Sequence, residues 1–118
     1  MIRDSYIVSN IRENILKVKL FSNLYFISKD KEKILIDTGH RMDRKTISFF
    51  FSNFIDFNSI TKVIFTHLHH DHCGNFDLFL RSQFFASKDE IESFKQDPHN
   101  TVMDKAIADM IKIIKINP

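Results

Sequence analysis

The segment VIFTHLHHDHCGN, Val63 to Asn75, places four of the chain's six histidines directly after a short apolar run. That run, Ile60 to Thr66, has the length of one strand and no polar alternation, which is typical of a strand in a sheet covered on both sides. Gly74 follows the histidines and permits a tight turn or a close backbone approach. The feature therefore predicts a polar cluster at the end of a buried strand.

The rest of the chain supplies further strands for such a sheet. Short runs of apolar residues, some alternating with polar ones, predict strands, while a charged turn at 29–33 would join two of them into a hairpin. Residues 10–14 read as a polar connection. The predicted strands span residues 5–10, 15–21, 23–28, 34–39, 60–66 and 82–87.

Helical spacing begins after Gly39. Apolar residues three and four apart predict a helix over residues 42–57, with Asp43 as its N-cap. Residues 75–80 read as a short helix or turn. Ser87, three residues before Glu90, predicts the start of a helix that Pro98 ends. Residues 101–116 show an amphipathic pattern and predict one helix. This order of elements indicates an α/β (α+β) domain with a mixed sheet and outer helices.

Composition narrows the class of protein. A chain of 118 residues suits one domain, 1–118, and a net charge of +2 without a basic cluster makes nucleic acid an unlikely partner. No apolar run is long enough to cross a membrane, and MIRDSYIVSN has charges where a signal peptide needs an apolar core. The single cysteine, Cys73, excludes an internal disulfide and fits a reducing compartment, so we expect a cytoplasmic protein.

The spacing within the cluster favours metal binding. In an extended or tightly turned segment, residues two apart point the same way, so His67 and His69 can converge on one point. Asp71 and His72 follow on the next turn and can converge on a second point. Imidazole and carboxylate groups are ligands for zinc, iron and related ions at sites that activate water. The alternative is a solvated polar loop.

These residues resemble the motif of the metallo-β-lactamase superfamily, threonine or serine followed by His-x-His-x-Asp-His. Here it reads THLHHDH, Thr66 to His72. An upstream IDTG, Ile36 to Gly39, is similar to the family's Asp-Thr-Gly turn, and the resemblance extends roughly from Leu20 to Phe94. It implies the N-terminal half of an αββα sandwich. It also implies a metal-dependent hydrolase, in which an activated water attacks an ester, thioester, lactone or similar bond of a small-molecule substrate.

The resemblance also implies residue roles. The metal ligands would be His67 and His69 for a first ion and Asp71 and His72 for a second, with Asp71 also acting catalytically on the attacking water. The cofactor would be one or two Zn²⁺ ions, with Fe or Mn as alternatives. Three further residues would act outside the ligand set. His70 would point away or contact a ligand without binding the metal, Asp37 would orient the site through hydrogen bonds, and Cys73 would pack as a small residue.

The family's second half normally supplies the remaining ligands, and this chain offers no clear substitute. His99, the one histidine after Cys73, reads as a surface or helix-cap residue. We therefore expect a homodimer or a second polypeptide to complete the site. A half-domain that binds metal without turnover is one alternative, and a nuclease-type relative is another. Half a sandwich would also leave one sheet face uncovered, which favours association.

Overall fold

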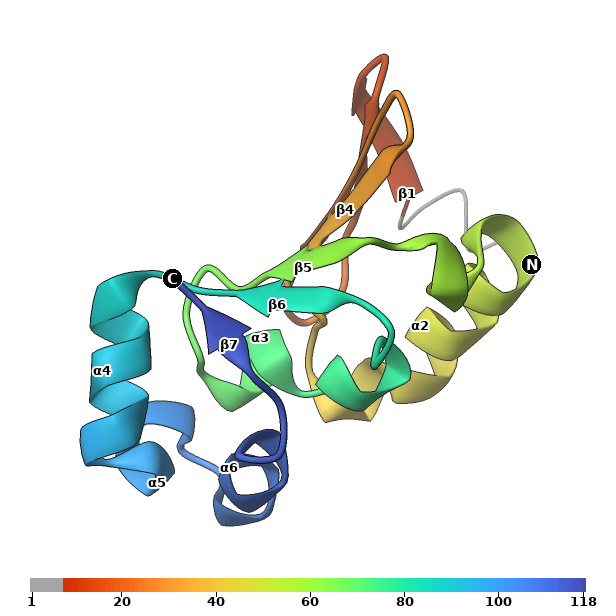
Figure 1. Cartoon of the computed structure of the whole chain (residues 1–118). Helices are drawn as coiled ribbons and strands as arrows, with labels where there is room; N and C mark the ends of the chain where they lie inside the picture. The colour runs from red at the N-terminus through yellow and green to blue at the C-terminus, as the bar shows by residue number, and fades with distance from the viewer. Residues whose placement is uncertain (1–7) are drawn as a thin grey trace.

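The computed structural model describes residues 8–118 and contains one seven-stranded mixed sheet (Figure 1). The strands lie side by side in chain order. The first four pair antiparallel, whereas β4 to β7 pair parallel. Their bounds are β1 Val8–Arg12, β2 Ile15–Val18, β3 Leu24–Lys29, β4 Glu32–Ile36, β5 Lys62–Ile64, β6 Gln83–Phe85 and β7 Ile116–Asn117. The predicted mixed sheet with outer helices is confirmed.

One face of the sheet forms the core. Phe26, Leu35, Val63 and Phe84 stand in register on neighbouring strands and are buried. The helices α3 to α6 lie on one side of β5 and β6, below these strands in Figure 1. Their buried side chains, such as Ile111, complete the same apolar cluster. Along β3 to β6, alternation therefore sends every second residue to this core.

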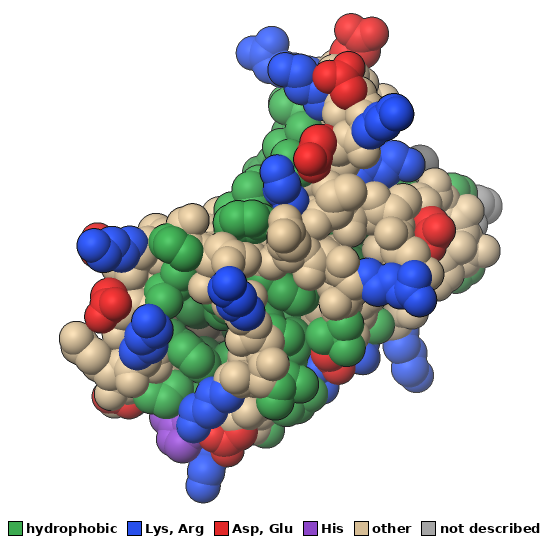
Figure 2. Space-filling view, in the orientation of Figure 1, with side chains coloured by type: hydrophobic (Ala, Val, Ile, Leu, Met, Phe, Trp, Pro, Cys, Tyr) green, Lys and Arg blue, Asp and Glu red, His purple; other side chains and the backbone are tan. Residues whose placement is uncertain are grey.

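The opposite face of the sheet is also apolar. Two rows of in-register side chains cross it, and none of their apolar members belongs to the core cluster or to the residues packed against it. Hydrophobic side chains are visible along one flank of the projecting strands in Figure 2. The apolar members of this sheet face are Ile15, Tyr25, Ile27, Ile34, Ile36, Ile64 and Phe85. All seven side chains are partly buried, and in Figure 1 no helix of residues 8–118 lies over this face.

Short helices connect the strands. The α-helices are α2 Arg44–Phe50, α3 His70–Cys73, α4 Lys88–Gln96, α5 Pro98–Val102 and α6 Lys105–Ile111. Four further short helical turns are η1 Arg41–Asp43, η2 Phe51–Ile55, η3 Phe57–Ser59 and η4 Phe76–Leu78. The last of these confirms the predicted short helix or turn. Ser87 caps α4 by accepting a hydrogen bond from Glu90 N at 3.2 Å, as predicted.

The helix predicted over 42–57 is only partly correct. It is divided into a 3-10 turn, α2 and a π-helical turn that ends at Ile55. Asp43 occupies the N-cap position of α2 but makes no capping hydrogen bond. Its carboxylate instead accepts from Phe21 N at 3.2 Å, which holds the loop between β2 and β3. A tertiary contact thus replaces the local cap.

The prediction of one helix over 101–116 is wrong. Met103 has a φ of 62°, a left-handed conformation that ends α5, and Asp104 then caps α6 through Ile107 N at 3.0 Å. Residues 116–117 form β7 rather than a last helical turn. Pro98 does not merely end α4, because it is also the first residue of α5. The amphipathic pattern of residues 101–116 indicates neither the break at Met103 nor the change from helix to strand before β7.

Each of the six predicted strands differs from the observed strand at one end or at both. The first three residues of the strand predicted over 5–10 lie outside the described residues. At its other end, β1 continues to Arg12, into the segment that was predicted to be a polar connection. The strand predicted over 15–21 ends at Val18. The following residues form a loop that reaches the histidine cluster.

No described helix is long and apolar enough to cross a membrane.

Two glycines bring the Asp-Thr-Gly turn against the histidine turn. Gly39 has a φ of 79°, which disfavours any side chain. A Cβ on Gly74 would lie 2.6 Å from the carbonyl oxygen of His70 and 2.8 Å from that of Gly39. The Gly74 N–H donates to the Gly39 carbonyl at 3.0 Å. This close backbone approach, predicted for Gly74, positions the site described next.

Candidate metal centre

The site is built where β4 and β5 end side by side. Asp37 follows β4 with a φ of 65° and is almost fully buried. Its carboxylate accepts two hydrogen bonds from Thr66, one from the backbone N–H at 2.8 Å and one from the hydroxyl at 2.7 Å. Because Thr66 immediately precedes the histidines, Asp37 fixes the start of the histidine turn.

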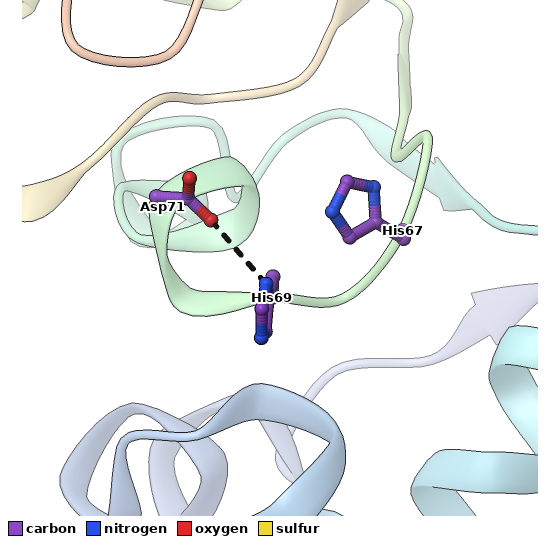
Figure 3. Close-up of side chains that lie close together, drawn as sticks. All are labelled: His67, His69 and Asp71. Carbon is purple, nitrogen blue, oxygen red and sulfur yellow. Dashed lines mark ion pairs between the residues drawn. The ribbon is translucent and has the colours of Figure 1, made fainter.

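Three side chains of this turn converge. One ligand atom each from His67, His69 and Asp71 lies within 4.8 Å of the others. Figure 3 shows the two rings and the carboxylate around a common space, with His69 facing Asp71. The Nδ1 of His69 lies 3.8 Å from Oδ1 of Asp71. Two imidazoles and a carboxylate are a donor set that suits zinc and other divalent ions.

The carboxylate of Asp71 has one oxygen without a partner. Its Oδ2 accepts a hydrogen bond from Ser22 Oγ at 3.0 Å, whereas its Oδ1 is buried and has no hydrogen bond. A buried carboxylate oxygen without a donor is costly, and a cation beside it would remove that cost. The orphaned oxygen faces the two histidines, so the residues present fit a divalent ion.

Opposing effects act on the pKa of Asp71. Burial raises this pKa, but the hydrogen bond from Ser22 and the charges of His72 and His69 outweigh burial, so that the pKa lies below its ordinary value. Asp71 is therefore held as a carboxylate, which is the form that binds a cation.

His72 lies beside His67, with the centroids of the two rings 4.0 Å apart. Its Nε2 is 3.6 Å from Oδ2 of Asp71, and its Nδ1 is 2.8 Å from Oδ2 of Asp37. A proton on Nδ1 would thus be donated to Asp37, leaving Nε2 toward Asp71. His67 is arranged alike, because its Nδ1 lies 3.2 Å from Thr66 Oγ1. Asp71 therefore lies close both to His72, its partner in the second expected pair, and to His69 of the first.

The remaining predicted residues lie outside this group. His70 packs edge-on against His40, with ring centroids 5.0 Å apart. Cys73 is buried in the core, where burial raises the pKa of its thiol to about 12, so that it is a poor source of thiolate. His99 lies on the surface with its Nε2 2.9 Å from Oδ1 of Asp109.

Three residues that contact the cluster were not identified from the sequence. Ser22 binds Asp71, Glu90 Oε1 accepts from the buried Leu68 N–H at 2.7 Å, and Met103 Sδ lies 2.9 Å from His69 Nε2. Each is distant in sequence from its partner. The sequence indicates the helix cap formed by Ser87 and Glu90. The Glu90 side chain, however, accepts a hydrogen bond from the histidine loop instead of bonding back to the backbone N–H of Ser87.

A cavity of about 430 Å³ opens beside the cluster. His67 and His69 line one side, and polar side chains of α4 and α5 line the other. No lysine or arginine is among its lining residues, which are His67, His69, Glu90, Ser93, Gln96, Asp97, Asn100 and Thr101. A small polar molecule could therefore reach the two imidazoles.

The chain is similar to known proteins in sequence and in fold. The family model described as the metallo-beta-lactamase superfamily matches residues 18–101. No curated protein matches the sequence. Among solved structures, the chain is similar to BJP-1, a subclass B3 metallo-beta-lactamase of Bradyrhizobium japonicum, with a TM-score of 0.65, 22% identity, and coverage of 75% of this chain and 35% of that one.

A second similar structure is the metallo-beta-lactamase MIM-1 from Novosphingobium pentaromativorans. The TM-score is 0.64 and the identity 19%, with 77% of this chain and 35% of that chain covered. A metallo-beta-lactamase of Cronobacter sakazakii gives a TM-score of 0.63 at 17% identity, over 76% of this chain and 34% of that chain. At these identities the likeness shows the fold. The chain spans about a third of the length of these structures.

Proposed function

Because this chain belongs to the metallo-β-lactamase superfamily, we propose that it forms part of a metal-dependent hydrolase acting on an ester, thioester, lactone or similar bond. The observation that carries the proposal is the buried Oδ1 of Asp71, which has no hydrogen bond and faces two imidazoles. A site kept for structure alone would satisfy that oxygen with a donor.

In this proposal, His67, His69 and Asp71 would hold one ion, and Asp71 with His72 would contribute to a second. The cofactor would be Zn²⁺, as one or two ions, with iron or manganese as alternatives. A bound divalent ion would supply Lewis-acid chemistry, lowering the pKa of water and stabilising negative charge in the transition state.

The chain's own residues would orient the reactants. Asp71, held as a carboxylate by Ser22, would orient the attacking water or accept its proton, which is the catalytic role proposed for it. Asp37 would keep His72 and Thr66 in place through its hydrogen bonds. The polar cavity beside His67 and His69 would receive a small-molecule substrate.

The uncovered apolar sheet face supports the proposal that residues 1–118 act as one half-domain completed by a second polypeptide. That face carries apolar side chains across β2 to β6, such as Ile27, Ile36 and Ile64, without helices over them in residues 8–118. A second polypeptide with a similar sheet would cover it and bring further ligands. A homodimer is the alternative, and light scattering on the purified chain separates a dimer from a monomer.

Two alternative functions follow from the same site. In the first, the half-domain binds metal without turnover. In the second, the chain is a nuclease-type relative, which has less support because the cavity has no lysine or arginine to hold phosphates.

The free thiol of Cys73 fits the proposed cytoplasmic location, where thiols stay reduced.

The test combines metal analysis with hydrolysis assays. We expect stoichiometric zinc by elemental analysis, and hydrolysis of ester, thioester or lactone substrates that depends on added zinc and is lost in His69→Ala. Stoichiometric metal without turnover would favour the binding half-domain. Purified protein that takes up no zinc would refute both.

A further inference from the structure

The ring of His69 lies between a carboxylate and a thioether. Its Nδ1 lies 3.8 Å from the unpaired Oδ1 of Asp71, and its Nε2 lies 2.9 Å from the thioether sulfur of Met103. A neutral imidazole carries its proton on only one of these nitrogens. The thioether can only accept a hydrogen bond, so the contact favours the proton on Nε2 and leaves the Nδ1 lone pair toward Asp71.

Met103 reaches this position through an uncommon backbone conformation. Its φ of 62° lies in the left-handed region, which non-glycine residues rarely adopt. Its N–H donates to the His99 carbonyl at 2.9 Å and closes α5, and Asp104 begins α6 immediately afterwards. The neighbouring helices thus force the conformation, and the side chain projects from this junction, 63% exposed, against His69.

Each of the other members of the cluster has a neighbouring polar group that fixes one of its atoms. Thr66 holds His67 at Nδ1, Asp37 holds His72 at Nδ1, and Ser22 holds Asp71 at Oδ2. His69 has no such partner in the described part of the chain except Met103. Met103 therefore occupies the position that a backbone carbonyl or carboxylate commonly takes behind a histidine that binds a metal.

We propose that Met103 is a positioning residue for the metal centre, whose thioether accepts the Nε2–H of His69 and so presents Nδ1 to the ion. The role deepens the proposed function and rests on its metal-binding part, but it does not require turnover by this chain. No bond is made or broken, because the sulfur acts only through the tautomer and ring orientation of His69.

The experiment compares Met103→Leu, which removes the acceptor and keeps the volume, with Met103→Gln, which restores an acceptor at a similar reach. Met42→Leu is the matched control, since Met42 is 68% exposed and, among the described residues, makes no hydrogen bond to His67, His69 or His72. The first readout is the tautomer of His69 in the metal-free chain, by ¹⁵N NMR roughly two pH units above the ordinary pKa of histidine. The second is zinc affinity by competition with a chromophoric chelator.

We expect the wild type and Met42→Leu to hold the proton of His69 on Nε2, while Met103→Leu shows an added Nδ1–H population and binds zinc about tenfold more weakly. Met103→Gln should recover both properties. The proposal is overturned if Met103→Leu keeps the wild-type tautomer. It is also overturned if affinity falls in both Met103 variants alike, because the residue would then act only through packing. A wild type that binds no zinc would overturn the proposed function and this role together, whereas zinc binding by the wild type with an unchanged tautomer in Met103→Leu would overturn the role of Met103 alone.

Discussion

Ser22 Oγ donates a hydrogen bond to Oδ2 of Asp71 at 3.0 Å and joins the loop after β2 to the histidine turn 49 residues later. Ser22 is almost fully buried, so water cannot easily replace its hydroxyl. The bond fixes which carboxylate oxygen turns toward His67 and His69. The loop after β2 is thus part of the site, although no feature of its sequence indicates a metal centre.

Replacing Ser22 with alanine should release the carboxylate of Asp71. We expect zinc affinity to fall about tenfold, because partners that orient a ligand typically contribute that much or more. Chelator competition measures the change. Ser28→Ala is the control, since its hydroxyl makes no hydrogen bond among the described residues. Equal affinities for Ser22→Ala and the wild type would contradict the role.

Glu90 should matter for the backbone of the histidine loop. Its carboxylate accepts from the N–H of Leu68, a fully buried residue between His67 and His69. Glu90→Ala leaves this N–H without a partner, so we expect a loss of about 1–3 kcal/mol in the free energy of unfolding. Urea denaturation measures it. Glu90→Gln keeps an acceptor and should lose less, and Glu92→Ala, exposed on the same helix, should be close to neutral.

The sequence predicts the parts of this site that are local. His67 to His72 lie in six consecutive positions after an apolar strand, so spacing alone brings their ligand atoms together. Ser22, Glu90 and Met103 could not be found this way, because their contacts with the turn span 49, 22 and 34 residues. Tertiary packing decides such contacts.

Tertiary packing also explains the errors in the predicted secondary structure. The apolar spacing over 101–116 continues across Met103, although its left-handed backbone ends one helix and Asp104 starts another. Asp104 is a residue type that often caps helices, and it could have indicated a helix start here. The apolar periodicity shows which side of a helix is buried, but it does not show where one helix ends and the next begins. The mixed sheet was predictable because strand patterning and the Asp-Thr-Gly turn are local in sequence.

Cys73 should be unreactive in the folded protein. Burial raises the pKa of its thiol to about 12, and alkylation requires the thiolate. At pH 8 we expect iodoacetamide to modify it at least about 1,000-fold more slowly than in urea, from a pKa difference of roughly three units. Mass spectrometry follows the reaction. Fast modification without denaturant would show that the thiol is accessible and weaken the case against Cys73 as a ligand.

Asp77 should make stability depend on acid pH. Its carboxylate contacts Arg41 at 2.9 Å and Arg44 at 2.8 Å, and both arginines also bind the segment after the histidine turn. Burial raises the pKa of Asp77, but the hydrogen bond from Arg44 and the charges of both arginines outweigh burial, so that the pKa lies below its ordinary value. A carboxyl whose pKa is lowered on folding contributes stability above its unfolded pKa, about 3.9, and loses it as the pH falls through the lower folded value.

Asp77→Asn should therefore lower the free energy of unfolding by about 1–2 kcal/mol at neutral pH, and this difference should shrink at pH values below roughly 3. Urea denaturation of both proteins across this range measures the effect. Glu13→Gln, which removes the same charge from an exposed turn, is the control and should change stability little at any pH. A difference between Asp77→Asn and the wild type that stays constant down to acid pH would mean that the ion pair with Arg41 and Arg44 is not its source, and that the loss comes from packing around the side chain instead.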